Sequence, residues 1–302
     1  MSKIKTIGVI DIGTNTILCL KASIDEKGTN IIFDKRFNYR AGRRLDNKGN
    51  ISLEYKTAMR KALFSALSAL GDCAKIEIAA TEVLRKPKDG LVFAQELSNQ
   101  RGCTVEIIDS QKEAELSFLG ATHGMDNVAE VIAVLDVGGG STELAVGKDG
   151  KLIDWSGVKF GAVATCETLG YERPFKEYMG ITEKAFRSSH FSRLLALPIG
   201  KRLVVGGSAV AIATILSGLN EYSPQQIQGF NIRKDDLFQL LDKLSIMSVE
   251  ERKKVMVFDA ERADIIVAGG AILLAFMEYA EIAALTVSTR GLRYGLLRGL
   301  LK

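Results

Sequence analysis

One motif occurs twice in this chain: a short buried strand that runs into an Asp-x-Gly turn. The first copy is Asp-Ile-Gly at positions 11–13, after the β-branched run 4–10, and the second is Asp-Val-Gly at 136–138, after the apolar run 131–135. The copies lie 125 positions apart, and each is followed by a β-hairpin pattern and then by alternating helix and strand patterns. We therefore expect an α/β fold built from two duplicated domains.

The two domains are expected to cover residues 1–125 and 126–302. No proline-rich or polar linker separates them, so the boundary is placed near 125–128 and the domains are expected to flank a cleft. The last helix, about residues 290–302, is a candidate to pack back on the first domain. Clefts between domains are favoured places for ligands.

Composition excludes several classes of protein. A chain of 302 residues that is 47% hydrophobic is long enough for two packed domains, so disorder and coiled coil are excluded. The formal net charge of +4 is too small to indicate DNA binding. The longest apolar stretch, 265–277, is shorter than the roughly 20 residues that a membrane span needs, so it predicts a buried helix.

Cysteine and histidine usage indicates no metal or redox centre of a common type. The four cysteines form no C-x-x-C motif, which argues against a zinc ribbon or a thioredoxin-like site. Four thiols behind an N-terminus with no signal-peptide pattern predict a reduced, cytoplasmic protein. His123 and His190 have no partner at ligand spacing and are interpreted as ordinary residues.

Both Asp-x-Gly turns have the residue types of a phosphate-binding loop. In the first, Asp11 is followed by Gly13, Thr14 and Asn15, whose N–H and hydroxyl groups can cradle phosphate oxygens. A plain hairpin turn is the alternative for this segment.

The second turn gives a stronger indication. It contains three consecutive glycines, which allow an anion to approach the backbone closely. Asp136 and Glu143 flank the turn and supply carboxylates of the kind that Mg²⁺ prefers. The candidate phosphate-binding residues of this turn are Gly138, Gly139, Gly140 and Ser141.

Two further segments allow both a functional and a structural interpretation. A strand runs into Gly206, Gly207 and Ser208 and then into a helix, which is either an anion-binding helix N-terminus or close strand–helix packing. Ser110 and Glu113 have the spacing of a helix capping box, while Glu113 is also a candidate general base.

Basic residues gather in two loops that follow strands. Arg36, Arg40, Arg43, Arg44 and Lys48 fall within 13 positions, and Arg85 opens a second basic segment. Solvated surface is the usual explanation for such charges. Arginines in loops at strand ends are also where bidentate phosphate contacts are made, so a locally positive entrance is predicted.

These motifs together resemble the exopolyphosphatase and guanosine-pentaphosphate phosphohydrolase family, whose members have two duplicated actin-like (ribonuclease H-like) domains. The resemblance covers nearly the whole chain. The segments that carry it are 10–16, 80–85, 113–120, 136–143, 161–163, 205–208, 261–270 and 288–295. Their order and spacing match the family, and the chain resembles the short form that lacks additional C-terminal helical domains.

The resemblance implies a role for each matching residue. Glu113 matches the glutamate that orients or deprotonates the attacking water, and Arg85 matches a phosphate-binding arginine. Asp136 and Glu143 match the carboxylates around a Mg²⁺ or other divalent cation. The matching phosphate-binding residues are Asp11, Gly13, Thr14, Asn15, Gly138, Gly139, Gly140, Ser141, Gly206, Gly207 and Ser208.

The chain also departs from the family pattern. The family has an arginine shortly after the first turn, where this chain has Leu18. The segment before the glutamate also differs, because it reads Ile-Asp-Ser-Gln-Lys-Glu-Ala over 108–114. Losing an arginine weakens a contact expected to bind phosphate, so the substrate range is left open.

The resemblance implies processive, metal-dependent hydrolysis of the terminal phosphate of inorganic polyphosphate. Guanosine pentaphosphate and tetraphosphate are further candidate ligands, and a homodimer is one candidate oligomeric state. Two alternatives stay open: a small-molecule kinase of the same fold, and a non-catalytic sensor of polyphosphate or of a nucleotide alarmone. No adenosine pocket or acceptor-facing aspartate is identified for a kinase, while Leu18 favours a sensor.

Overall fold

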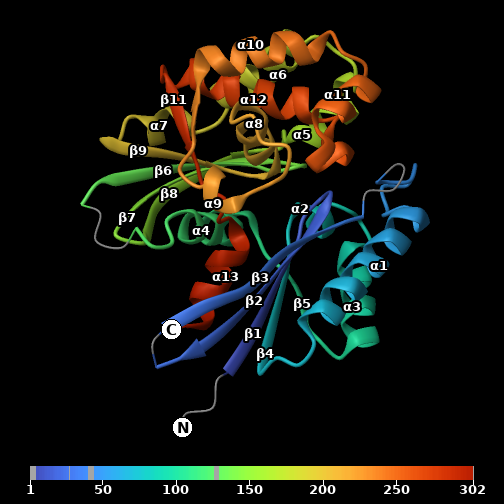
Figure 1. Cartoon of the computed structure of the whole chain (residues 1–302). Coiled ribbons are helices and arrows are strands. Elements are labelled where there is room, and N and C mark those ends of the chain that lie inside the picture. Colours follow the sequence, from blue (N-terminus) through green and yellow to red (C-terminus); the bar gives the residue numbers. More distant parts are fainter. Residues whose placement is uncertain (1–4, 27, 40–43, 126–128, 302) are drawn as a thin grey trace. The chain divides into compact units, whose positions relative to one another are not determined.

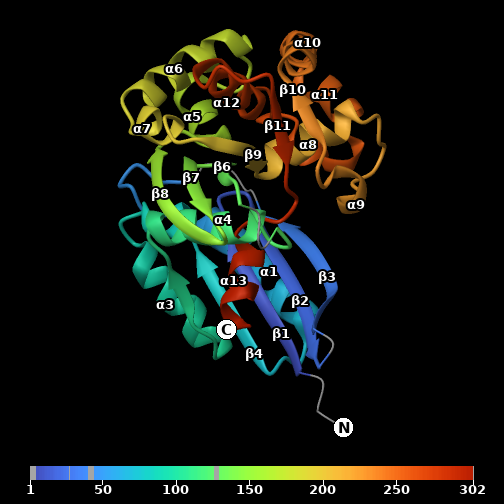
Figure 2. The ribbon, with the colours of Figure 1, turned by 90° about the vertical axis from the view of Figure 1, so that its left-hand side faces the viewer.

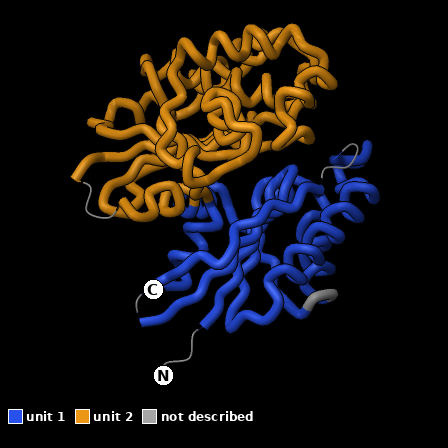
Figure 3. Tube along the Cα trace, viewed as in Figure 1, with its two compact units in different colours: residues 1–116, 292–302 blue, residues 117–291 orange. Residues whose placement is uncertain are grey.

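The chain forms two compact units in a computed structural model that describes residues 5–26, 28–39, 44–125 and 129–301, the side chains of residues 100 and 101 excepted. Unit 1 consists of Met1–Leu116 and Leu292–Lys302, and unit 2 of Ser117–Gly291 (Figure 3). The division falls inside helix α4 (Ser110–Ala121), earlier than the boundary expected near 125–128. Packing explains the position. Leu116 contributes to a core cluster of unit 1, whereas the ring of Phe118 lies against Gly147 in unit 2.

Unit 1 contains a five-stranded mixed sheet (Figure 1). Its first three strands form an antiparallel meander, and the other two run parallel to the first. The spatial order is β3-β2-β1-β4-β5, and the bounds are β1 (Lys5–Ile12), β2 (Thr16–Asp25), β3 (Gly28–Asn38), β4 (Lys75–Ala80) and β5 (Val105–Ile107).

Helices cover both faces of this sheet. Alternation along β1 directs Ile10 and Ile12 to the cluster shared with α1 (Leu53–Leu70) and α3 (Gly90–Arg101). Ile7 and Val9 point to the opposite face, where α13 (Leu292–Leu300) packs (Figure 2). Ser52 caps the start of α1, because its side chain accepts a hydrogen bond from the N–H of Tyr55 at 3.2 Å.

Unit 2 repeats this sheet plan with one added strand. Its order is β10-β11-β9-β6-β7-β8, in which β6, β7 and β8 form the antiparallel meander and β9 runs parallel to β6. The bounds are β6 (Val131–Val137), β7 (Thr142–Lys148), β8 (Lys151–Val158), β9 (Ile199–Val205), β10 (Asn231–Arg233) and β11 (Ala284–Val287). The shared order confirms the predicted duplicated α/β fold.

The core of unit 2 is organised around α12 (Ile266–Tyr279), whose residues 266–277 are all buried. This confirms the prediction of a buried helix for the longest apolar stretch. No helix within the described part of the chain is long and apolar enough to cross a bilayer. The other helices are α5 (Ala162–Leu169), α6 (Phe175–Arg187), α7 (Phe191–Leu195), α8 (Gly207–Leu216), α9 (Pro224–Ile227), α10 (Lys234–Ser245), α11 (Val249–Val255) and the 3₁₀ segment η1 (Val257–Arg262).

Candidate active site

The first predicted turn joins β1 to β2 at the carboxyl edge of the unit 1 sheet. The N–H of Gly13 donates to the carbonyl of Thr16 at 3.0 Å, which closes the hairpin. Asp11 and Thr14 are buried, while Asn15 is half-buried at the tip. Leu18 stands directly opposite Asp11 in the register of β1 and β2. The side chain beside the carboxylate is therefore apolar where the family has an arginine.

Arg85 and Glu113, the two predicted catalytic residues, contact each other in unit 1. Nη2 of Arg85 lies 2.9 Å from Oε2 of Glu113, and its Nη1 donates to the carbonyl of Ile108 at 2.7 Å. The arginine lies on the short helix α2 (Glu82–Arg85), not in the loop that was predicted. Because α2 follows β4 and α4 follows β5, both side chains lie at the carboxyl edge of parallel strands, where α/β proteins bind ligands.

The predicted capping box at Ser110 is wrong. Ser110 is the first residue of α4, and the carboxylate of Asp109 accepts the hydrogen bond from the N–H of Lys112 at 2.7 Å. Asp109, one residue earlier, is the N-cap. Glu113 is therefore the fourth residue of the helix after that cap, whereas a capping box needs a glutamate at the third, where it can bind the N–H of the cap. The glutamate side chain instead pairs with Arg85.

The second predicted turn joins β6 to β7 and repeats the geometry of the first. The N–H of Gly138 donates to the carbonyl of Ser141 at 3.0 Å, as Gly13 does to Thr16. Gly140 and Ser141 are buried, and Gly138 and Gly139 are half-buried. The two halves of the duplication therefore present the same hairpin turn, with glycines replacing the polar residues in the second.

Helix α5 holds the carbonyls of the second turn. The N–H of residue 162 donates to the carbonyl of Gly138 at 3.0 Å, and those of residues 163 and 164 donate to Gly139 at 2.8 and 3.0 Å. A Cβ on Gly161 would lie 2.6 Å from the carbonyl oxygens of Gly138 and Gly139, so only glycine fits there. The N–H groups of a helix start, which can bind anions, are used here to fix the turn.

Asp136 and Glu143, the predicted metal ligands, are direct partners in the β6–β7 register. Opposite residues of antiparallel strands lie on one face with Cβ atoms about 4.5–5.5 Å apart, so the two carboxylates are neighbours. Burial raises the pKa of Asp136, while a 2.5 Å hydrogen bond from the Ser117 hydroxyl opposes the shift. The Glu143 side chain lies over Gly157 of β8.

These two carboxylates could supply some, but not all, of the ligands of a divalent cation. Mg²⁺ is typically held by one or two carboxylates, with water and phosphate oxygens completing the octahedron. No cluster of three or more acidic, histidine or cysteine side chains suited to a metal occurs among the described residues. Asp136 and Glu143 would therefore hold the cation together with oxygen atoms of the substrate.

Ser117 is a further candidate site residue, which the sequence motifs did not indicate. It is buried on α4, four residues after Glu113, so the two side chains share one face of that helix. The spacing is readable in the sequence, but the hydrogen bond to Asp136 joins residues 19 positions apart and leaves no local signal.

The third predicted turn joins β9 to α8, and the structure shows the close strand–helix packing that was one of its two interpretations. Gly206 has a φ of +110°, and a Cβ there would lie 2.3 Å from the carbonyl oxygen of Val137, so close packing requires glycine. Ser208 is buried, and its hydroxyl has no hydrogen-bond partner in the described residues. Arg262, which pairs with Asp259 at 2.9 Å, lies against Gly207. A cation thus adjoins the start of α8.

The basic segment 36–48 is less uniform than expected. Arg44 is buried and pairs with Glu82 at 2.7 Å, so it is a structural ion pair and not part of a positive entrance. The expectation for Arg44 was therefore wrong, because the chain folds this residue inward. Arg36 lies exposed on β3, and Lys48 is exposed in a turn. Arg40 and Arg43 lie outside the described residues.

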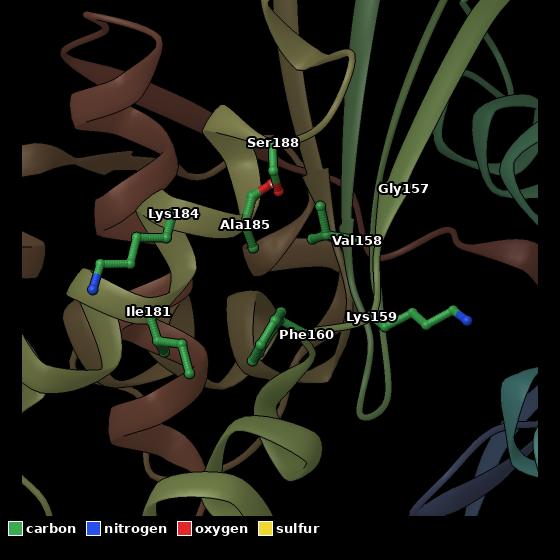
Figure 4. Close-up of a pocket in the computed structure, with 8 residues that line it drawn as sticks. All are labelled: Gly157, Val158, Lys159, Phe160, Ile181, Lys184, Ala185 and Ser188. Atoms are coloured by element: carbon green, nitrogen blue, oxygen red, sulfur yellow. The ribbon is translucent and has the colours of Figure 1, made fainter.

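A hollow of about 410 Å³ in unit 2 lies between the end of β8 and α6. Its lining contains none of the predicted site residues. Phe160, Ile181 and Val158 form its apolar side, and the two lysines, Lys159 and Lys184, extend away from the other lining side chains (Figure 4). The hollow does not have the converging positive charge that a phosphate group requires.

Two units of the same topology, each with a small-residue turn after its first strand, define an actin-like α/β protein. The match to a family model makes the assignment specific. Residues 21–302 match the Ppx/GppA phosphatase family, and the chain belongs to that family.

Individual relatives agree with this assignment. The chain is 25% identical to exopolyphosphatase 2 of Mycobacterium tuberculosis, over 96% of this chain and 97% of the relative. It resembles the structure of the Aquifex aeolicus Ppx/GppA enzyme with a TM-score of 0.81 and 24% identity, covering 98% of this chain and 100% of the other. An exopolyphosphatase structure from Cytophaga hutchinsonii gives a TM-score of 0.86 at 20% identity, with 98% of both chains covered. These structures show the shared fold.

Proposed function

We propose that this chain is an exopolyphosphatase that releases orthophosphate from the end of inorganic polyphosphate. Membership of a phosphatase family and similarity to a protein named exopolyphosphatase support the proposal. The observation that carries it is the ion pair between Arg85 and Glu113 at the carboxyl edge of the unit 1 sheet. An arginine able to bind phosphate and a candidate base are thus adjacent. Guanosine pentaphosphate, with the same kind of terminal anhydride, is included as a second substrate.

In the proposed reaction, Glu113 accepts a hydrogen bond from a water molecule. This hydrogen bond orients the water so that a lone pair on its oxygen points towards the terminal phosphorus. The water oxygen bonds to phosphorus, the bond to the bridging oxygen breaks, and Glu113 takes the proton. Arg85 leaves Glu113 to contact the phosphate oxygens, where its planar donors suit bidentate binding. Orthophosphate and a shortened chain are the products.

The remaining candidate residues would neutralise charge and position the phosphates. N–H groups of the glycine-rich turns are preorganised donors, which stabilise charge without reorganisation during the reaction. We assign Asp136 and Glu143 to a Mg²⁺ ion, which when bound would offset negative charge on the phosphate oxygens.

Replacing Glu113 with Gln tests the proposal most directly. The measurement is orthophosphate release from long-chain polyphosphate with Mg²⁺, where we expect kcat to fall about 10²- to 10⁴-fold. Glu115→Gln is the matched control, because Glu115 lies on the same helix but pairs with Lys112 at the surface. A Glu113→Gln variant that retains wild-type kcat would refute the role of Glu113.

A non-catalytic sensor is the second candidate function. The observation that favours it is Leu18, which stands opposite Asp11 at the position where the family has an arginine. Binding of polyphosphate without orthophosphate release by the wild-type chain would favour the sensor. Phosphate transfer from ATP to a small molecule would favour a kinase, so ATP belongs in the substrate panel beside polyphosphate and guanosine pentaphosphate.

A further inference from the structure

Two buried tyrosines lie beneath the first turn and hold its carbonyl groups. The hydroxyl of Tyr39 donates to the carbonyl of Gly13, and the hydroxyl of Tyr55 donates to that of Thr14. The backbone N–H of Tyr39 also donates to the carbonyl of Asn15 at 3.2 Å. Three consecutive carbonyls of the turn are thus bound by residues that come from outside it.

The tyrosines form a rigid support. Tyr39 follows β3 and Tyr55 lies in the first turn of α1, and their side chains are almost fully buried. Their rings pack edge to face, with centroids 5.4 Å apart and planes at 72°. Burial raises the pKa of Tyr39 well above its usual value, and the electrostatic effect of the neighbouring Tyr55 adds to the shift. Tyr39 therefore stays protonated, and remains a donor, at neutral pH.

Holding a carbonyl also fixes the next N–H group. In a trans peptide the C=O and the following N–H lie in one plane and point in opposite directions. Tyr39 therefore sets the direction of the Thr14 N–H, and Tyr55 sets that of the Asn15 N–H. Both donors are directed away from the tyrosines.

The second turn is supported in a comparable way by different chemistry. There the N–H groups at the start of α5 bind the carbonyls of Gly138 and Gly139. Unit 1 has no helix start in this role among its described residues, and two hydroxyl groups bind the corresponding carbonyls. The duplicated turns are thus each fixed through their carbonyl oxygens.

We propose that Tyr39 and Tyr55 are positioning residues, which hold the Thr14 and Asn15 N–H groups in the direction required to bind phosphate. They act through the turn and do not touch the substrate. The inference rests on one part of the proposed function, namely that the first turn binds a phosphate chain. It does not depend on hydrolysis of that chain.

The test uses Tyr39→Phe and Tyr55→Phe in the full chain, which remove one hydroxyl each and keep the buried rings. The probe is inorganic tripolyphosphate with Mg²⁺, and its Kd is measured by calorimetry. We expect each variant to bind about tenfold more weakly, the effect of misdirecting one charge-assisted hydrogen bond. In the hydrolysis assay KM rises more than kcat falls.

Tyr178→Phe is the matched control. Tyr178 is fully buried in unit 2, and its hydroxyl donates to the carbonyl of Gly170 at 2.5 Å. Removing it costs a donated hydrogen bond of the same kind, and one accepted from the N–H of Arg173 at 3.3 Å. Both lie at the C-terminal end of α5, not at the end that contacts the second turn. We expect a comparable loss of Tm and a Kd for tripolyphosphate within twofold of wild type.

Amide hydrogen exchange provides a readout that does not depend on ligand. We expect faster exchange over residues 11–16 in the two variants and unchanged exchange in β6. Variants that bind tripolyphosphate as tightly as wild type, or a Tyr178→Phe variant that is weakened equally, would overturn the inference.

Failure of the proposed function can be distinguished from failure of this inference. A wild-type chain that binds tripolyphosphate but releases no orthophosphate refutes the proposed hydrolysis and leaves the tyrosine test valid. A wild-type chain that does not bind tripolyphosphate refutes both.

Discussion

Gly161 caps the start of α5 and packs against the second turn, and Gly161→Ala tests whether this contact fixes the turn. The glycine has a φ of −120° and a ψ of 179°, which alanine adopts without strain. The cost is therefore steric, since the new Cβ would lie 2.6 Å from carbonyl oxygens that belong to the backbone. Relieving the clash must move α5 away from Gly138 and Gly139.

The magnitude follows from the three hydrogen bonds of 2.8–3.0 Å that this movement stretches. Each contributes about 0.5–1.5 kcal/mol net, so we expect the free energy of unfolding to fall by about 2–4 kcal/mol. For a unit of this size that corresponds to a decrease in Tm of about 2–4 °C per kcal/mol. Binding of tripolyphosphate should weaken as well, because the N–H groups of the turn lose their fixed direction.

The assay is urea unfolding together with calorimetric tripolyphosphate binding. Gly180→Ala on α6 is the control, because a Cβ there meets no atom within 4 Å. It should raise stability by about 0.5–1 kcal/mol through helix propensity alone. If Gly161→Ala unfolds like wild type, the steric argument is wrong. If it is destabilised but binds tripolyphosphate normally, α5 does not determine the donor geometry of the turn.

Two further predictions concern unit 1. Asp34→Ala removes the carboxylate that binds Arg293 through two hydrogen bonds of 2.7 and 2.6 Å and Tyr294 at 3.1 Å. Because the guanidinium is buried, we expect a loss of about 3 kcal/mol in urea unfolding, and a change below 1 kcal/mol would contradict this. Although burial opposes the shift, the ion pair with Lys56 and a backbone hydrogen bond lower the pKa of Asp89. A carboxylate whose pKa is lower in the folded state stabilises the fold fully at pH values above its unfolded pKa of about 3.9. That contribution to stability is lost as the pH falls through the folded-state pKa. Asp89→Asn should therefore cost about 1 kcal/mol at pH 7 and flatten the acid limb of a stability–pH curve, whereas parallel curves would refute the reasoning.

The features that could be predicted from the sequence depend on local signals. The two Asp-x-Gly turns follow runs of buried apolar residues, and α1 starts directly after Ser52, where a capping serine and helical apolar periodicity agree. Alternation and turn chemistry act within a few residues, so they are readable before any tertiary contact is known. The buried helix at 265–277 was readable for the same reason.

The parts that could not be predicted depend on contacts between distant segments. Tyr55 reaches a carbonyl 41 positions away, and Arg85 pairs with Glu113 across 28 positions. The capping box failed because two residues competed for one position, and the energy difference between Asp109 and Ser110 as caps is small. Arg44 was expected at the surface because composition does not reveal that Glu82 would accompany it inside.

The attachment of α13 to unit 1 has a consequence for synthesis. Leu296 and Leu297 belong to the same core cluster as Ile7 and Val9, and they leave the ribosome after the whole of residues 117–291. Domains usually fold in the order in which they are made. Here unit 2 is an uninterrupted segment that can fold during translation, whereas the β1 face of unit 1 stays uncovered until α13 has emerged after it. The half that is translated first is therefore the last to be completed.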